Sequence, residues 1–123
     1  SVSEVLGAIS NAEADLSNSL VSGGKTEATL KLPGAVIKAK RLSPAEIAAA
    51  GEKISVEVPG STASVALPTD LLQQVGDAIV TLAAFDGKML NLTDTEGNTV
   101  DSAGLVDIKI RPTSNPGQEV KVS

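Results

Sequence analysis

The first twenty residues place apolar side chains at every third or fourth position, which is the spacing of one face of an α-helix. Ser1 and Glu4 have the spacing of a capping box, and Ser22-Gly23-Gly24 supplies the glycine that commonly ends a helix. The pattern predicts an amphipathic helix over about residues 3–20. Its apolar positions are Val5, Leu6, Ile9, Leu16 and Leu20.

Beyond Gly24 the apolar period falls from about 3.6 residues to about 2, which indicates β-strands with one buried face. Turn residues such as Pro33-Gly34 and Pro59-Gly60 separate the alternating segments. The predicted strands are Thr26–Leu32, Val36–Leu42, Lys53–Val58, Ala63–Leu67, Asp77–Phe85, Lys88–Leu92, Leu105–Arg111 and Gln118–Val122.

One of these strands, Asp77–Phe85, is almost continuously apolar instead of alternating. A strand of this kind is typical of a position buried on both faces, so we expect it at the centre of a sheet. Asp86-Gly87 follows it and is the strongest hairpin signal of the chain. Lys88–Leu92 is therefore expected to return alongside the central strand.

Two short helical turns interrupt the strands. Ser43 is placed to cap the first, with Pro44 at the first helical position and Glu46 closing a capping box. Pro68-Thr69-Asp70 begins the second, which covers Leu71–Val75 and is ended by Gly76. Each is long enough for one or two turns only.

About eight short strands at intervals of 8–15 residues predict a mainly β fold, an antiparallel β-sandwich. An open barrel stays an alternative, because strand order cannot be read from periodicity. We expect one domain, in which the helix of residues 1–22 packs on one edge or end of the sandwich of residues 23–123.

The composition narrows the function. The chain has no His and no Cys, which removes the commonest general base, the thiolate nucleophile and most zinc ligation, so no catalytic residues are predicted and an enzyme is not expected. The net charge of −5 disfavours nucleic acid as a partner, and no stretch has the length of a membrane span. Phe85 is the single aromatic residue, so a binding surface must work without aromatic anchors.

The densest basic run is Lys38-Ala39-Lys40-Arg41. It is a small basic patch or, in the interpretation that we favour, the solvent face and end of a strand. Lysine in such a strand also guards against pairing along a sheet edge.

An acidic, oxygen-rich loop suggests a calcium site. Calcium prefers six to eight oxygen ligands, and this loop has Gly97 in its middle, although its spacing is not that of an EF-hand. The alternative is an ordinary polar turn, which favours the same residue types. The candidate ligands are Asp94, Glu96, Asn98 and Asp101. No other cofactor is predicted.

Asn91-Leu92-Thr93 is the chain's single N-x-T sequon. In a secreted eukaryotic protein Asn91 would be a glycosylation site, which would require this part of the chain to be exposed.

The order of several motifs resembles the body of the GAIN domain of adhesion-type receptors and polycystin-like proteins. The resemblance extends over about residues 1–122, and "LPTDLL" is its sharpest element. It implies an extracellular β-sandwich. The segments that carry it are "VIKAKRLSP" (Val36–Pro44), "SVALPTDLL" (Ser64–Leu72), "AIVTLAAFD" (Ala78–Asp86) and "SAGLVDIKIR" (Ser102–Arg111).

The chain departs from that family at its autoproteolysis segment. The family's Cys- and Trp-bearing segment and its cleavage site are not present here, so self-cleavage is carried over to no residue. A sandwich without its last strands would expose an unpaired edge, and such an edge invites a strand from a partner or from a neighbouring copy.

We therefore expect a non-catalytic structural or adhesion module, extracellular or at the cell surface, that holds or pairs with neighbouring protein segments through sheet edges. Two alternatives stay open. One is a subunit of a bacterial or phage surface fibre or adhesin. The other is a calcium-dependent binding module that uses the Asp94–Asp101 loop.

Overall fold

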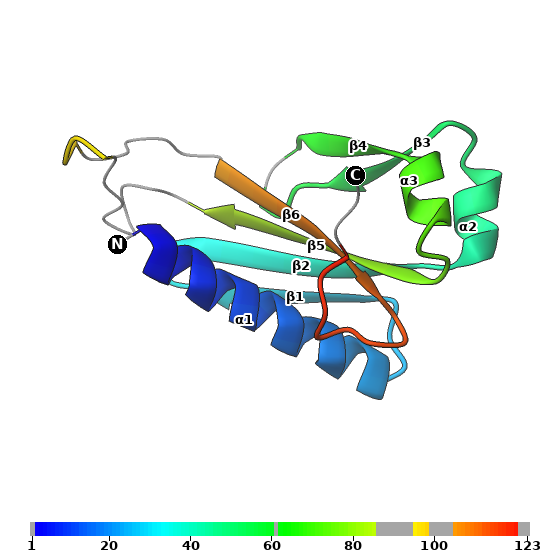
Figure 1. Ribbon diagram of the computed structural model, residues 1–123, viewed down its shortest axis with the longest axis horizontal. Coiled ribbons are helices and arrows are strands. Elements are labelled where there is room, and N and C mark those ends of the chain that lie inside the picture. Colours follow the sequence, from blue (N-terminus) through cyan, green and yellow to red (C-terminus); the bar gives the residue numbers. More distant parts are fainter. Residues whose placement is uncertain (1, 61, 86–94, 99–104, 121–123) are drawn as a thin grey trace.

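The computed structural model describes residues 2–60, 62–85, 95–98 and 105–120 (Figure 1). Within these ranges the chain forms three helices and six strands. The helices are α1 (Val2–Ser22), α2 (Pro44–Ala49) and α3 (Thr69–Gln73). The strands are β1 (Glu27–Leu32), β2 (Ala35–Leu42), β3 (Lys53–Glu57), β4 (Ser64–Pro68), β5 (Ala78–Phe85) and β6 (Leu105–Pro112).

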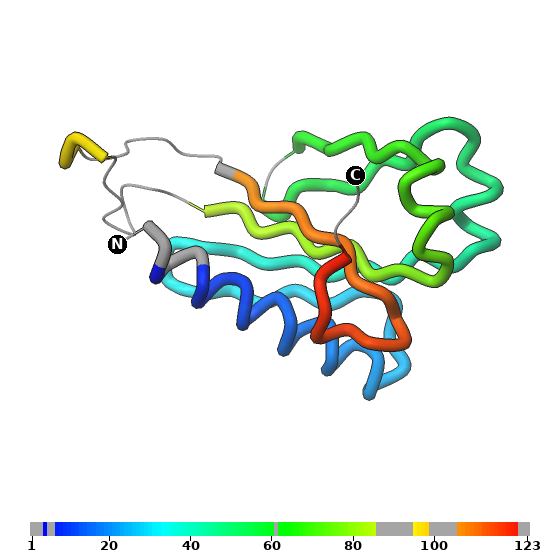
Figure 2. The backbone as a smooth tube through the Cα atoms, viewed as in Figure 1, coloured from blue at the N-terminus to red at the C-terminus, as the bar shows by residue number. Residues whose placement is uncertain are grey.

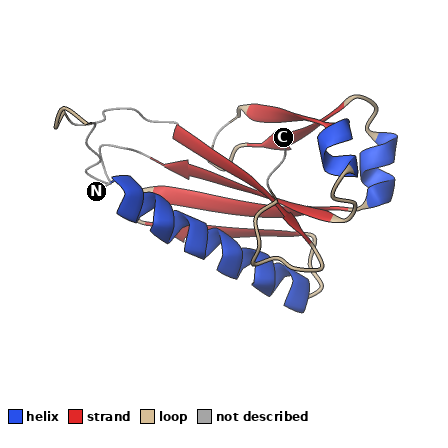
Figure 3. Cartoon of the chain, viewed as in Figure 1, coloured by secondary structure: helices blue, strands red, loops and turns tan. Residues whose placement is uncertain are grey.

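The strands form two antiparallel sheets. The larger sheet has the order β1-β2-β5-β6, and the smaller is the hairpin β3-β4. Helix α1 lies along one face of the larger sheet, while the hairpin and the two short helices lie on its other side (Figure 1, Figure 3). The prediction of a mainly β fold with an N-terminal helix is confirmed.

Strand β5 is the centre of the larger sheet. Its side chains alternate between the two faces: Ile79 and Ala83 pack with residues of α1, while Val80 and Leu82 pack with residues of the hairpin and the short helices. All four are fully buried. The prediction that this strand is buried on both faces is therefore confirmed.

Helix α1 packs across the face of the larger sheet, so the prediction that it lies at an edge or end is wrong. Its apolar stripe, which includes Ile9 and Leu20, contacts Ile37 and Ala39 of β2 and the neighbouring part of β5. A helix of 21 residues is about 30 Å long, and only a sheet face offers apolar surface over that length. Three alanines of the strands, Ala35, Ala39 and Ala83, belong to the clusters that α1 covers.

The short helices begin where the sequence predicts. Ser43 accepts a hydrogen bond from the Glu46 amide and Glu46 accepts one from the Ser43 amide, so the predicted capping box is present. The start of α3 is fixed differently, because the Thr69 hydroxyl donates to the carbonyl oxygens of Gly51 (2.6 Å) and Glu52 (3.0 Å). These bonds tie α3 to the loop that follows α2.

Two predicted strands do not appear among the described residues. The return strand Lys88–Leu92 lies outside them, and the described neighbours of β5 are β2 and β6. Residues 118–120 form no strand, although the Val120 amide donates to the Ile110 carbonyl (2.8 Å), and residues 121 and 122 lie outside the described part. The alternating pattern of β1 predicts that Leu32 is buried, but Leu32 is exposed.

The fall in burial from β5 to β6 allows a direct test of this core. Leu82 and Ile108 are cross-strand neighbours, but Leu82 is fully buried whereas Ile108 is 37% exposed. Leu82→Ala should lower the free energy of unfolding by about 2–5 kcal/mol, because it leaves a cavity. Ile108→Ala, the matched control, should cost about 1 kcal/mol or less. Equal losses in denaturant titrations would contradict this placement of the core.

Candidate functional site

Strand β6 forms one edge of the larger sheet. In an antiparallel strand successive residues turn their backbone groups alternately to the two sides. Because Ile110 accepts a hydrogen bond from Val120 on the side away from β5, Val106 and Ile108 also direct their backbone groups away from β5. Pro112 occupies the next such position, where its missing N–H costs no bond to β5.

The outer edge of β6 is apolar. The side chains of Val106 and Ile108 are each 37% exposed and lie on the same side of the strand as Ile110, which is buried in the core beneath the hairpin. Among the described residues, none pairs with the outward backbone groups of Val106 or Ile108. Within the described part of the chain, this edge therefore combines unpaired backbone donors and acceptors with apolar side chains.

The opposite edge, β1, has a different character. Thr26 accepts a hydrogen bond from the Arg41 amide (2.8 Å), so the alternate residues Glu27, Thr29 and Lys31 direct their backbone groups outward. All three are exposed, and two of them are charged. Charged residues on an edge strand disfavour pairing with another strand. The two edges of the sheet are therefore chemically unequal.

The segment after β6 occupies one end of its outer edge. Figure 2 shows residues 113–120, in red, turning back toward β6. The turn places Val120 opposite Ile110, and a hollow of about 460 Å³ lies beside them. It is lined by Pro112, Gln118, Glu119 and Val120.

A buried charge network joins α1 to β6. The Lys109 ammonium donates to Glu13 Oε1 (2.9 Å) and also pairs with the Asp107 carboxylate. Glu13 is fully buried, and its Oε2 has no partner among the described residues. Burial raises the pKa of Glu13 above its usual value. Burial lowers the pKa of Lys109, but its hydrogen bonds to the two carboxylates outweigh this effect and hold that pKa above its usual value.

Glu13 was not singled out by the sequence analysis, although the sequence contains a signal for it. It follows Ile9 by four residues and precedes Leu16 by three, so it falls on the apolar stripe of the helix. An acid at such a position needs a partner on the opposing surface, and Lys109 supplies it from β6.

The basic run of the sequence is divided between two faces of β2. Lys38 and Lys40 lie on the face away from α1, while Arg41 lies on the face of α1 and binds Asp77 through two hydrogen bonds (3.0 and 2.8 Å). The Arg41 guanidinium holds the pKa of Asp77 below its usual value. Since β2 lies between β1 and β5, these residues guard no sheet edge, so the edge-guarding part of that interpretation is wrong.

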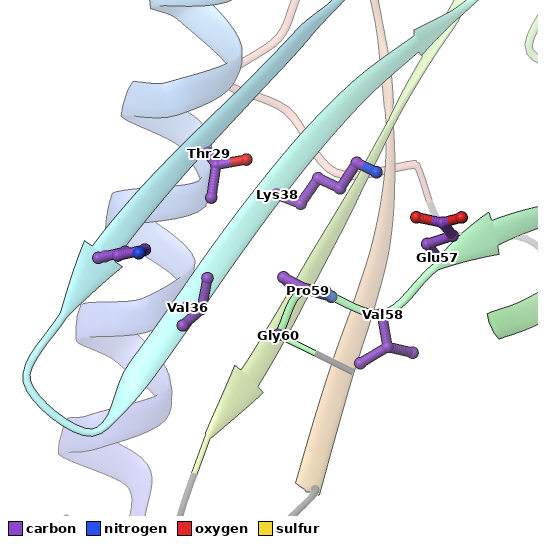
Figure 4. A pocket seen from close by; sticks show the side chains of 8 residues that line it. Thr29, Val36, Lys38, Glu57, Val58, Pro59 and Gly60 are labelled. Atoms are coloured by element: carbon purple, nitrogen blue, oxygen red, sulfur yellow. The ribbon is translucent and has the colours of Figure 1, made fainter. Parts of the chain in front are cut away.

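A shallow groove of about 530 Å³ lies between the β1-β2 hairpin and the turn that follows β3 (Figure 4). Its walls are mixed in charge, and Lys38 is already paired with Glu27 (3.1 Å). No single ligand chemistry is indicated by this mixture. The groove is lined by Thr29, Lys31, Val36, Lys38, Glu57, Val58, Pro59 and Gly60.

The proposed calcium loop is only partly described. Glu96 and Asn98 lie in an exposed turn in which Gly97 has a φ of 84°, a conformation that favours glycine. Asp94 and Asp101 lie outside the described residues, as does the sequon residue Asn91. The described residues contain no group of three or more His, Cys, Asp or Glu that could hold a metal ion. The calcium and glycosylation sites stay predictions.

Comparisons with protein-family models, with curated proteins and with solved structures find no match to this chain. Among the described residues, no helix has both the length and the apolar character needed to cross a membrane. The outer edge of β6, with its exposed Val106 and Ile108, is the candidate interaction site that the geometry itself defines.

The charge network predicts a pH-dependent loss of stability. Lys109→Met leaves Glu13 buried without its cation, so it should lower the free energy of unfolding at pH 7 by about 3–5 kcal/mol. Burial raises the pKa of Glu13 in the folded state, so folding costs the charged form more than the protonated form. The loss should therefore shrink as the pH falls toward 4.5, the usual Glu value. Denaturant titrations between pH 4 and pH 8 measure this loss of unfolding free energy, because a buried carboxyl group titrates over roughly that range.

The control adds Glu13→Gln to Lys109→Met. The Glu13→Gln change removes the buried, unpaired negative charge and keeps the shape of the side chain. The double variant should therefore regain most of the stability at pH 7. A loss that does not depend on pH and is not relieved by Glu13→Gln would contradict a charged Glu13–Lys109 pair.

Proposed function

We propose that this chain is a non-catalytic structural or adhesion module that pairs through the outer edge of β6 with an extended segment of a neighbouring protein. The observation that carries the proposal is the pair of exposed apolar residues, Val106 and Ile108, on a strand whose outward backbone groups have no partner among the described residues. The charged residues Glu27 and Lys31 on β1 support the assignment of this role to β6.

Pairing along a sheet edge suits the composition of the chain. Backbone hydrogen bonds supply affinity with little dependence on sequence, and alternate side chains supply specificity. A surface of this kind needs no aromatic anchors, and the single aromatic residue, Phe85, is buried. Pairing along the β6 edge is thus a mode of binding that an aromatic-poor chain can support.

We further propose a GAIN-like, extracellular module. The support is the order of the elements that carry the resemblance. Val36–Pro44 spans β2 and the start of α2, and Ser64–Leu72 spans β4 and most of α3. A role in holding neighbouring segments agrees with an aromatic-poor chain that offers a strand edge.

The test places a proline on each edge of the larger sheet. In Ile108→Pro the ring replaces an N–H that points away from β5, so the ladder between β5 and β6 keeps its bonds. Thr29→Pro makes the same change on the outer edge of β1 and is the matched control. Extended peptides are first selected from a random library for binding to the wild-type chain. Their affinity for Ile108→Pro should be at least about tenfold lower than for the wild type, which corresponds to about 1.4 kcal/mol.

The same peptides should bind Thr29→Pro with the affinity that they have for the wild type. Both variants should still unfold in a cooperative thermal transition, which shows that they are folded. Peptides that tolerate Ile108→Pro, or that lose affinity for Thr29→Pro, would contradict pairing at β6. Failure to select any extended peptide would contradict it as well.

A further inference from the structure

The outer edge of β6 presents two different environments to an added strand. Val106 and Ile108 direct their side chains to the side of the β3-β4 hairpin, while Asp107 and Lys109 direct theirs to the side of α1. A strand laid along this edge alternates in the same way. Its side chains therefore meet apolar neighbours on one side and charged neighbours on the other.

On the α1 side, the most accessible of the charges in this network is negative. Two carboxylates, Glu13 and Asp107, share the single ammonium of Lys109. The side chain of Asp107 is 28% exposed, against 14% for Lys109 and none for Glu13, so Asp107 is the charge that an added strand reaches. Arg111, the other cation on this side, is buried and donates to the Pro116 carbonyl (3.1 Å).

The described structure also shows how one segment of the chain already meets the outer edge of β6. Residues 113–117 reverse the chain, so that Val120 lies opposite Ile110 and runs antiparallel to β6. The Val120 amide occupies the outward hydrogen-bonding position at Ile110. Among the described residues, none pairs with the outer backbone groups of Val106 and Ile108. In antiparallel pairing the residues opposite Val106 and Ile108 would each exchange two backbone hydrogen bonds with them.

We propose that the β6 edge selects an extended, antiparallel segment with the pattern apolar–basic–apolar. The two apolar side chains would cover Val106 and Ile108, and the basic side chain between them would lie opposite Asp107. Opposite charges directly across a strand pair attract, and like charges repel. This inference rests on the proposed edge pairing and adds the chemistry of the partner.

The experiment uses two acetylated, amidated five-residue peptides that differ at one position, Thr-Val-Lys-Val-Thr and Thr-Val-Glu-Val-Thr. Each is titrated into the ¹⁵N-labelled 123-residue chain, and the shifts of the Val106 and Ile108 amides report binding at the edge. The lysine peptide should bind about three- to tenfold more tightly than the glutamate peptide, as expected for exchanging an attractive cross-strand pair for a repulsive one.

Two variants assign that preference to Asp107. Asp107→Asn should reduce the difference between the peptides to less than about twofold, and Asp107→Lys should reverse it. Glu13 keeps its bond from Lys109 in both variants. An unchanged melting temperature for Asp107→Asn keeps the comparison valid if the more drastic Asp107→Lys does not fold.

The outcomes separate this inference from the proposed function. Equal binding of both peptides at Val106 and Ile108 would overturn the charge selection and leave edge pairing intact. Binding of neither peptide would contradict edge pairing itself. Binding only to a variant that ends at Val120 would show that the last residues of the chain hold the edge, which would overturn the inference of a separate partner.

Discussion

The larger sheet depends on the complete burial of β5. Hydrogen bonds to β2 and β6 satisfy its backbone on both sides, so its apolar side chains can be covered on both faces without unpaired polar groups. A strand buried in this way needs a layer on each side. Helix α1 covers one face, and the β3-β4 hairpin with the two short helices covers the other. The edge strands β1 and β6 receive less cover, and β6 is left with exposed apolar residues.

The two edges of the sheet show how this arrangement produces a binding surface. On β1 the outward positions carry Glu27 and Lys31, which suit contact with water and discourage a second strand. On β6 they carry Val106 and Ile108, and the charged residues Asp107 and Lys109 point instead toward α1. The network that holds α1 to the sheet therefore also sets the charge that a strand added at β6 would meet.

Much of the fold could be predicted from the sequence, because its signals are local. The capping box at Ser43 and the continuous apolar run of β5 each depend on neighbouring residues, and both are confirmed. Strand order and the placement of α1 depend on contacts between distant segments, which periodicity does not encode. The same holds for the candidate site: Val106 and Ile108 read as ordinary alternating strand residues until β6 is found at an edge. Glu13 was overlooked because its partner, Lys109, lies far along the chain.

Amide hydrogen exchange of the isolated chain at low concentration tests the central claim most directly, because it reports which backbone groups of β6 are paired. The amides of Asp107 and Lys109 point toward β5 and should be strongly protected. The amides of Val106 and Ile108 point outward and should exchange nearly as fast as those of an unstructured peptide. Equal protection of all four amides in a monomeric sample would mean that the outer edge is already paired, and would contradict a free strand edge as the basis of function.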